Sequence, residues 1–95
     1  MVLRGATITS DKCLYRELTH EYLQQSLGFP DYYGRNFSAL ADCLSEAGEP
    51  LLITVNIDPD TLPTDMQAFV MKLVQVIARE SLVNENVSLI IEHTV

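Results

Sequence analysis

One segment of the chain carries most of the local structural information in the sequence. Residues 29–44 read FPDYYGRNFSALADCL, a turn rich in proline, tyrosine and glycine that leads into a short amphipathic segment. Asn36 is a good N-cap for a helix because its side-chain oxygen can accept a backbone N–H of the first turn. Phe37, Leu40 and Leu44 follow at helical spacing. The segment therefore predicts a turn and a helix with one buried stripe.

On the N-terminal side, the sequence predicts one strand and one helix. Residues 2–4 form a short strand, which the next residue, a glycine, ends. Ser10 or Asp11 is a suitable N-cap for a helix over residues 12–26, and Gly28 ends that helix. The apolar positions that predict this helix are Leu14, Leu18, Tyr22 and Leu23.

On the C-terminal side, residues 51–55 read LLITV, which predicts a central strand buried on both faces. The prolines and aspartates of residues 58–63 predict a loop. Thr64 or Asp65 is the expected N-cap of the longest helix, which ends near Val83. Its apolar stripe comprises Phe69, Val70, Leu73, Val76 and Ile77.

The order of these elements predicts the fold class. A turn at residues 84–86 precedes a last strand at residues 87–91. Strands that alternate with helices favour right-handed crossovers, and hence an α/β fold with a three-stranded parallel sheet and helices packed against it. Ninety-five residues correspond to a single domain over residues 1–95.

Composition and charge narrow the function classes. Thirteen acidic and six basic residues give a net charge of −7, which disfavours nucleic-acid and anionic membrane partners and speeds encounter with basic proteins. The same acidity could serve solubility alone. The first residues lack the apolar core of a signal peptide, and no run approaches the roughly 18 apolar residues of a membrane span. We expect a cytoplasmic protein, with Cys13 and Cys43 reduced and packed in the core.

The sequence offers little support for catalysis or for a cofactor. Cys13 and His20 are seven residues apart and could share a helix face, but they do not complete a metal site. The same pair could act as a nucleophile and base, but no oxyanion hole is indicated. Asp58, Asp60 and Asp65 lack the glycine and glutamate of an EF-hand and are expected to be solvated. We expect neither an enzyme nor a metal or other cofactor.

The helix that Asn36 caps, and that Gly48 and Pro50 are expected to end, also presents a polar face. Ser38, Asp42 and either Ser45 or Glu46 are three and four residues apart, so they line one side of the helix. The simplest interpretation of Asp42 is a solvated helix residue, and the alternative is a contact to a partner.

The turn before this helix carries two tyrosines followed by Gly34. Tyrosine offers a large apolar area with a polar end, and it is enriched at the centre of protein interfaces. Gly34 lets the backbone approach a neighbouring surface closely. Either tyrosine could instead anchor the turn to the core.

The segment resembles the signature of the barstar family, small bacterial proteins that inhibit a ribonuclease by plugging its active site. The family pattern is Pro-acid-Tyr-Tyr-Gly-x-Asn-x-x-Ala-Leu-x-Asp-x-Leu, and residues 30–44 match every specified position. The resemblance implies a barstar-like fold. It also implies that Tyr32 and Asp42 face the active site of the enzyme, where the aspartate stands in for a substrate phosphate among Arg and His side chains.

Three positions depart from the family's namesake. Ser38 stands where the namesake has a partner-binding aspartate, and Ala41 stands where it has a tryptophan. Arg79 falls where the namesake has a glutamate that faces a basic residue of the enzyme. We therefore expect a basic nuclease or toxin with a different charge pattern, one that offers an acid to Arg79 or Arg35.

The predicted function is that of a monomeric, antitoxin-like protein inhibitor. The residues expected to contact the partner are Tyr32, Gly34, Asn36, Phe37, Ser38, Ala41, Asp42, Glu46 and Arg79. The alternative is a regulatory module of barstar-like fold that binds an unrelated protein, or a second copy of itself, through the same face.

Overall fold

The computed structural model describes residues 4–92, which form a two-layer α/β fold. In chain order the elements are β1 (Arg4–Thr9), the 3₁₀ helix η1 (Ser10–Lys12), α1 (Arg16–Leu27), α2 (Phe37–Ser45), β2 (Leu51–Asn56), the 3₁₀ helix η2 (Thr64–Met66), α3 (Gln67–Val83) and β3 (Val87–Ile91). The strands are parallel and lie in the order β1-β2-β3. The predicted fold class, a three-stranded parallel sheet with helices packed against it, is confirmed.

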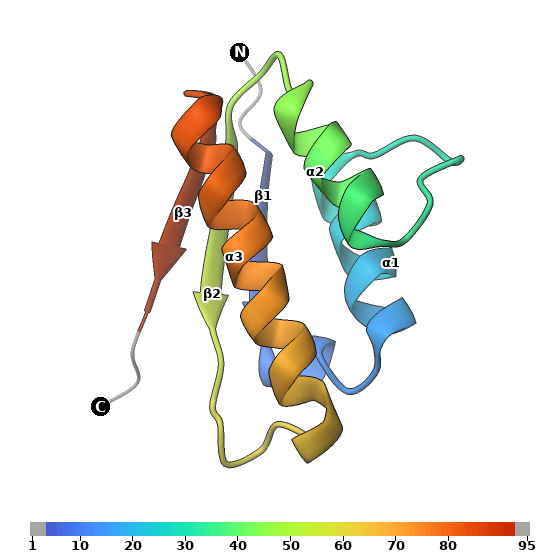
Figure 1. Ribbon diagram of the computed structural model, residues 1–95, viewed down its shortest axis with the longest axis vertical. Coiled ribbons are helices and arrows are strands. Elements are labelled where there is room, and N and C mark those ends of the chain that lie inside the picture. The colour runs from blue at the N-terminus through green and yellow to red at the C-terminus, as the bar shows by residue number, and fades with distance from the viewer. Residues whose placement is uncertain (1–3, 93–95) are drawn as a thin grey trace.

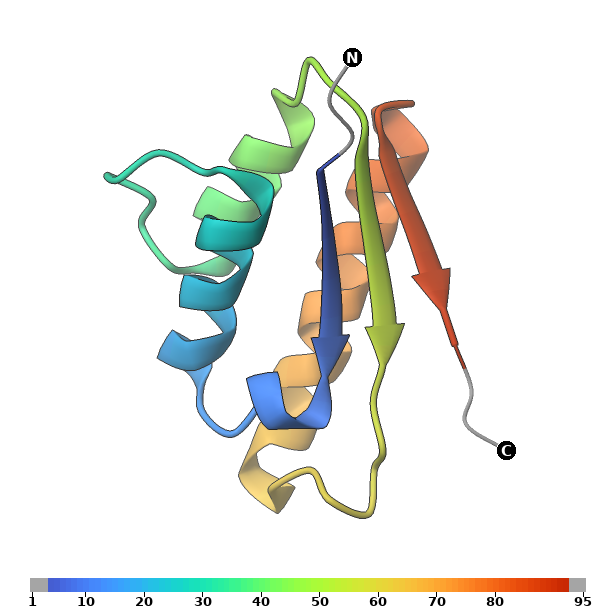
Figure 2. The same cartoon turned by 180° about the vertical axis from the view of Figure 1, so that it is seen from behind.

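All three α-helices cover the same face of the sheet (Figure 1). Seen from behind, the sheet lies in front of the helices (Figure 2). Burial therefore alternates along β2: Ile53 and Val55 are buried against the helices, whereas Leu52 and Thr54 are only half-buried. The prediction that this strand is buried on both faces is wrong, because helices pack on one face only.

Strand β1 extends beyond its predicted end. Gly5 lies within the strand and pairs with Leu52, and pairing continues to Thr9 opposite Asn56. The alternation of exposed and buried side chains continues through Ala6 and Ile8, so the glycine does not end the strand. The first two residues of the predicted strand, at positions 2 and 3, lie outside the described residues.

Helix α1 begins later than predicted because the chain first makes η1. Ser10 does not cap α1: its hydroxyl accepts the backbone N–H of Asp58 at 2.8 Å, and the Asp11 carboxylate accepts the Thr9 hydroxyl. Leu14 lies in the connection and is 51% exposed, so its assignment to the apolar stripe is wrong. Gly28 ends the helix as predicted, in a left-handed conformation with φ of 71°.

Helix α3 has the predicted end but not the predicted cap. Thr64 and Asp65 belong to η2, and Met66 takes the N-cap position without a side-chain hydrogen bond. Past the last turn, the Asn84 amide donates to the Leu44 carbonyl at 2.8 Å and to the Ala47 carbonyl at 3.1 Å. Asn84 thereby ties the end of α3 to the end of α2.

The core lies between the sheet and the three helices. The buried apolar residues are Ala6, Ile8, Cys13, Leu23, Leu27, Tyr33, Leu40, Leu44, Leu51, Ile53, Val55, Leu62, Met66, Phe69, Val70, Leu73, Ile77 and Val87. Among residues 4–92, no helix combines the length and the apolar composition needed to cross a membrane.

Candidate functional site

The loop between α1 and α2 holds its two tyrosines in opposite environments. Tyr33 is only 6% exposed, and its hydroxyl lies 2.7 Å from Nδ1 of the buried His20. Tyr32 is 88% exposed. One tyrosine therefore anchors the loop, as one interpretation of the sequence allowed, and the other stands in solvent.

The anchor continues into an aromatic cluster beneath the loop. The His20 ring lies 6.1 Å from the ring of Phe37 and 5.8 Å from that of Phe69, between centroids. Phe37 and Phe69 are themselves 5.2 Å apart. Phe37, the first residue of α2, is thus packed against the core and only half-buried.

Burial changes the acid–base behaviour of the anchor. It lowers the pKa of His20, and the positive charge of Arg35 lowers this pKa further while Glu17 acts in the opposite direction. Burial also raises the pKa of Tyr33. Both shifts favour the uncharged forms, so a neutral imidazole and a protonated phenol form the hydrogen bond at neutral pH.

Helix α1 holds the rest of the loop through Gln24. The Gln24 amide donates to the Pro30 carbonyl at 2.9 Å and accepts a hydrogen bond from Arg35 at 3.2 Å. Arg35 has a positive φ of 53°, the left-handed conformation that non-glycine residues rarely adopt. Its guanidinium is held at α1 by the hydrogen bond to Gln24.

Asn36 caps α2 as predicted. Its Oδ1 accepts the backbone N–H of Ala39 at 2.8 Å, and its Nδ2 donates to the Gly34 carbonyl at 3.3 Å. A Cβ at Gly34 would lie 3.2 Å from this Nδ2 and 3.4 Å from the Ala39 Cβ. A larger residue at position 34 would therefore press on the Asn36 side chain, which would have to shift by a few tenths of an ångström.

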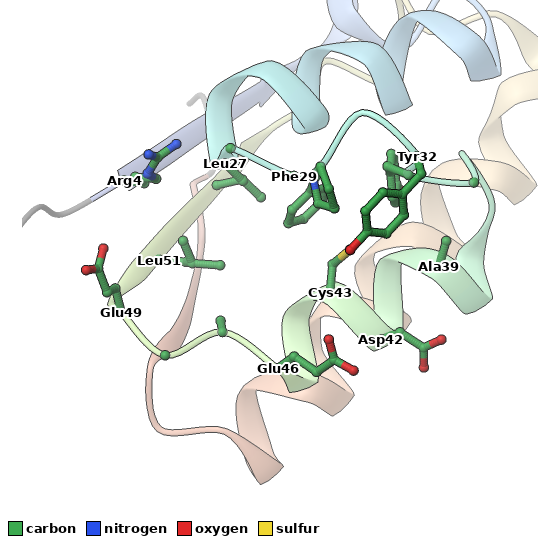
Figure 3. A pocket seen from close by; sticks show the side chains of 16 residues that line it. Arg4, Leu27, Phe29, Tyr32, Ala39, Asp42, Cys43, Glu46, Glu49 and Leu51 are labelled. Carbon is green, nitrogen blue, oxygen red and sulfur yellow. The ribbon is translucent and has the colours of Figure 1, made fainter.

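A cleft of about 760 Å³ opens between this loop and α2. Phe29 and Leu51 lie within it, Asp42 and Glu46 line its α2 side, and Arg4 lies toward the opposite end (Figure 3). The full lining is Arg4, Leu27, Gly28, Phe29, Pro30, Tyr32, Tyr33, Gly34, Ala39, Asp42, Cys43, Glu46, Ala47, Gly48, Glu49 and Leu51. The cleft thus combines an apolar floor with an acidic rim.

The carboxylates on the α2 rim are exposed to solvent. Among residues 4–92, no side chain forms a hydrogen bond or an ion pair with the carboxylate of Asp42. Between Asp42 and Glu46 lies Cys43, whose thiol has a raised pKa because of burial and of these two negative charges. Cys43 is only half-buried, so the prediction that both thiols lie in the core holds for Cys13 alone.

A second hollow, of about 410 Å³, lies between α2 and α3. It is lined by Phe37, Ser38, Ala41, Lys72, Val76, Arg79 and Glu80. Lys72 and Arg79 are exposed, whereas Glu80 is half-buried. This hollow therefore carries an excess of positive charge, in contrast to the cleft.

The predicted contact residues thus fall into two groups. Tyr32, Gly34, Asp42 and Glu46 line the cleft, whereas Phe37, Ser38, Ala41 and Arg79 line the hollow. Asn36 is the N-cap of α2 and lines neither the cleft nor the hollow. The predicted polar face is consequently divided: Ser38 is exposed toward α3, and Asp42 and Glu46 are exposed toward the loop.

Sequence reasoning missed residues on both sides of α2. Lys72 precedes Arg79 by seven residues, two helical turns, so their spacing could have revealed a shared face. Phe29 and Glu49 enter the cleft from loops, and no periodic signal marks them.

The other polar residues singled out in the sequence have structural contacts. Cys13 precedes α1, so it does not share a helix face with His20, which bonds to Tyr33 instead. The Asp58 carboxylate accepts the backbone N–H of Asp60 at 3.0 Å in a turn. Within residues 4–92, no three His, Cys, Asp or Glu side chains group closely enough to hold a metal ion.

Comparison with protein families agrees with the fold. The family described as Barstar (barnase inhibitor) matches residues 1–91. This chain belongs to the Barstar family. The resemblance predicted from residues 30–44 is confirmed and extends over nearly the whole chain. Members of the Barstar family are described as inhibitors, in agreement with the prediction of a non-enzymatic protein.

A curated relative carries a similar description. "Putative ribonuclease inhibitor YrdF" of Bacillus subtilis (strain 168) is 59% identical to the chain over 29 residues, which are 30% of this chain and 32% of the relative. The similarity thus spans about a third of the length of that relative.

Proposed function

We propose that the chain inhibits a ribonuclease or a similar nuclease toxin by covering its active site with the loop of residues 28–36 and the exposed side of α2. The observation that carries this proposal is the Asp42 carboxylate, which lines the same cleft as the exposed Tyr32 and has no polar partner among residues 4–92. Membership in a family of barnase inhibitors supports the choice of target.

The chemistry of a nuclease site explains why Asp42 is the central acceptor. An enzyme that binds the phosphates of RNA presents Arg, Lys or His side chains, and a carboxylate accepts charge-assisted hydrogen bonds from the same groups. Tyr32 adds apolar contact area with few rotatable bonds. The net charge of −7 accelerates encounter with a basic enzyme.

Two positions in the hollow between α2 and α3 support a target other than that of the family's namesake. Ser38 is neutral and Arg79 is positive where the namesake carries carboxylates. In measured complexes, that of the namesake among them, losing one partner of a buried charge pair costs about 2–5 kcal/mol, and like charges in contact cost several. The target is therefore a basic nuclease or toxin with a different arrangement of charges.

The decisive test is Asp42→Ala, with Asp65→Ala as the matched control. Both changes remove one exposed carboxylate, but Asp65 lies in η2, outside the cleft and the hollow. Inhibition of a panel of barnase-type ribonucleases and binding by calorimetry should be weakened about 30-fold or more by Asp42→Ala and unchanged by Asp65→Ala. Urea unfolding should show both variants as stable as the wild type. Unchanged binding by Asp42→Ala, or equal losses in the two variants, would overturn the proposal.

A second candidate is an interaction module that binds an unrelated protein through the same face. The positively charged hollow favours it, because this feature departs from the namesake's acidic surface. A pull-down from native lysate with the wild type and Asp42→Ala distinguishes the two functions. Specific recovery of a protein without nuclease activity would support the module.

We propose the cytoplasm as the compartment of the protein. Both cysteines are free, as expected there.

A further inference from the structure

The two depressions that flank α2 carry opposite charge. The cleft has three carboxylates in its lining, Asp42, Glu46 and Glu49, against one cation, Arg4. The hollow has two cations, Lys72 and Arg79, against one carboxylate, Glu80. A partner that covers α2 must therefore meet a negative surface on one side of the helix and a positive surface on the other.

The positive side is concentrated on one face of α3. Lys72 and Arg79 are the exposed charged residues of this helix, and they lie two turns apart on the side that faces α2. Among residues 4–92, neither forms an ion pair with a carboxylate. Two of the six basic residues of an acidic chain thus stand together, and Glu80, the one carboxylate in the lining of the hollow, forms an ion pair with neither.

The α2 side of the hollow carries no charged side chain. Phe37, Ser38 and Ala41 of α2 line a volume of about 410 Å³ together with Lys72, Val76, Arg79 and Glu80 of α3. Ser38 and Ala41 are small and uncharged, so α2 offers no counter-charge to Lys72 and Arg79 in the hollow. The hollow is therefore open to a side chain from outside, and its charge selects a negative one.

We propose that this hollow receives an acidic side chain of the partner, held by Arg79 and Lys72, and that it sets the specificity of the chain within its family. The inference rests on the proposed function, because it assumes that the partner covers α2. It narrows the partner to a nuclease in which a carboxylate lies next to the basic active site. Arg35 does not serve this role, because its guanidinium bonds to Gln24 on α1.

Barnase, the ribonuclease named in the description of the family, is the probe for this proposal. The resemblance implies that a basic residue of that enzyme faces the Arg79 position, so the wild-type hollow should repel it. We expect Arg79→Glu to bind barnase at least about 10-fold more tightly than the wild type does. Gln67→Glu, an exposed position at the start of α3 outside the hollow, lowers the net charge by one and should change the affinity less than about twofold.

A reciprocal experiment tests directly whether Arg79 attracts an acidic side chain of the enzyme. In a set of barnase variants in which each exposed Lys or Arg is changed singly to Glu, at least one should bind the wild-type chain about 10-fold more tightly than barnase does. When the chain carries Arg79→Gln, the same barnase variant should bind no more tightly than barnase does. Glutamine is used here because a glutamate at position 79 would stand next to Glu80 and add a second negative charge. No gain from Arg79→Glu, or a gain equalled by Gln67→Glu, would overturn the proposal.

Asp42→Ala, introduced alone and together with Arg79→Glu, distinguishes the two proposals. If Asp42→Ala weakens binding while Arg79→Glu has no effect, the proposed function stands and the role of the hollow is refuted. If Arg79→Glu strengthens binding while Asp42→Ala has no effect, the hollow is confirmed and Asp42 is not the central acceptor. Thermal unfolding of each variant shows that the fold is retained.

Discussion

Two adjacent tyrosines divide the loop before α2 into a root and a tip. The root consists of Tyr33, His20, Phe37 and Phe69, whose rings pack together around a hydrogen bond of 2.7 Å. The tip, Tyr32, is 88% exposed. Tyr33 is thus packed in the fold, whereas Tyr32 is left exposed for the contact with a partner that we propose.

This division has a physical reason. A loop that presents an aromatic residue to a partner loses less conformational entropy on binding when its backbone is already fixed. Gln24 and His20 fix the backbone from α1, and Asn36 fixes it at the start of α2. The tip can then offer its apolar area without ordering the loop at the moment of binding.

The largest expected loss of stability comes from removing Tyr33, the residue through which the loop joins the root. Tyr33→Ala deletes a buried aromatic ring and leaves His20 without its hydrogen-bond partner, so it should destabilise the fold by about 3–5 kcal/mol. Urea unfolding measures this loss as a lower transition midpoint at unchanged slope.

Tyr33→Phe separates the two contributions. It keeps the ring and removes the hydroxyl, so the loss should be only about 1–3 kcal/mol. A loss below about 1 kcal/mol in Tyr33→Ala would show that the loop is not anchored at this residue.

A smaller effect on stability is expected from lowering the pH until His20 is protonated. The pKa of His20 is lowered in the folded state, so below about pH 6.5 the unfolded chain binds a proton that the folded chain excludes. Stability should therefore fall as the pH drops through this range, by at most about 1.4 kcal/mol per pH unit. Urea unfolding of the wild type and His20→Gln at pH 7.5, 6.5 and 5.5 measures the difference. Parallel pH dependence in the two proteins would contradict this assignment.

The sequence predicted those features of the fold that have local causes. Asn36 caps α2 and Gly28 ends α1 because the required groups lie within a few residues of each other. The incorrect boundaries have distant causes. Ser10 is a good cap by its chemistry, but its hydroxyl bonds to Asp58, 48 positions along the chain.

The sequence predicted which segment carries the candidate site, but not which of its residues are exposed together on one surface. The roles of Tyr32 and Tyr33 could not be distinguished from spacing, because the hydrogen-bond partner of Tyr33 lies 13 residues away in α1. The separation of Ser38 from Asp42 depends on where α3 packs against α2. Only the tertiary structure contains that information.

The smallest expected effect on stability comes from changing the tip. Tyr32→Ala removes a side chain that is 88% exposed and lines the mouth of the cleft, so the free energy of unfolding should change by less than about 0.5 kcal/mol. Binding to a nuclease should nevertheless weaken at least about 10-fold, because an aromatic side chain at the centre of an interface contributes about 2 kcal/mol or more. Calorimetric titration of Tyr32→Ala and Tyr32→Phe against the same enzyme separates the ring from its hydroxyl. If Tyr32→Ala instead lowered stability as much as Tyr33→Ala does, the division into root and tip would be wrong, and both tyrosines would serve the fold.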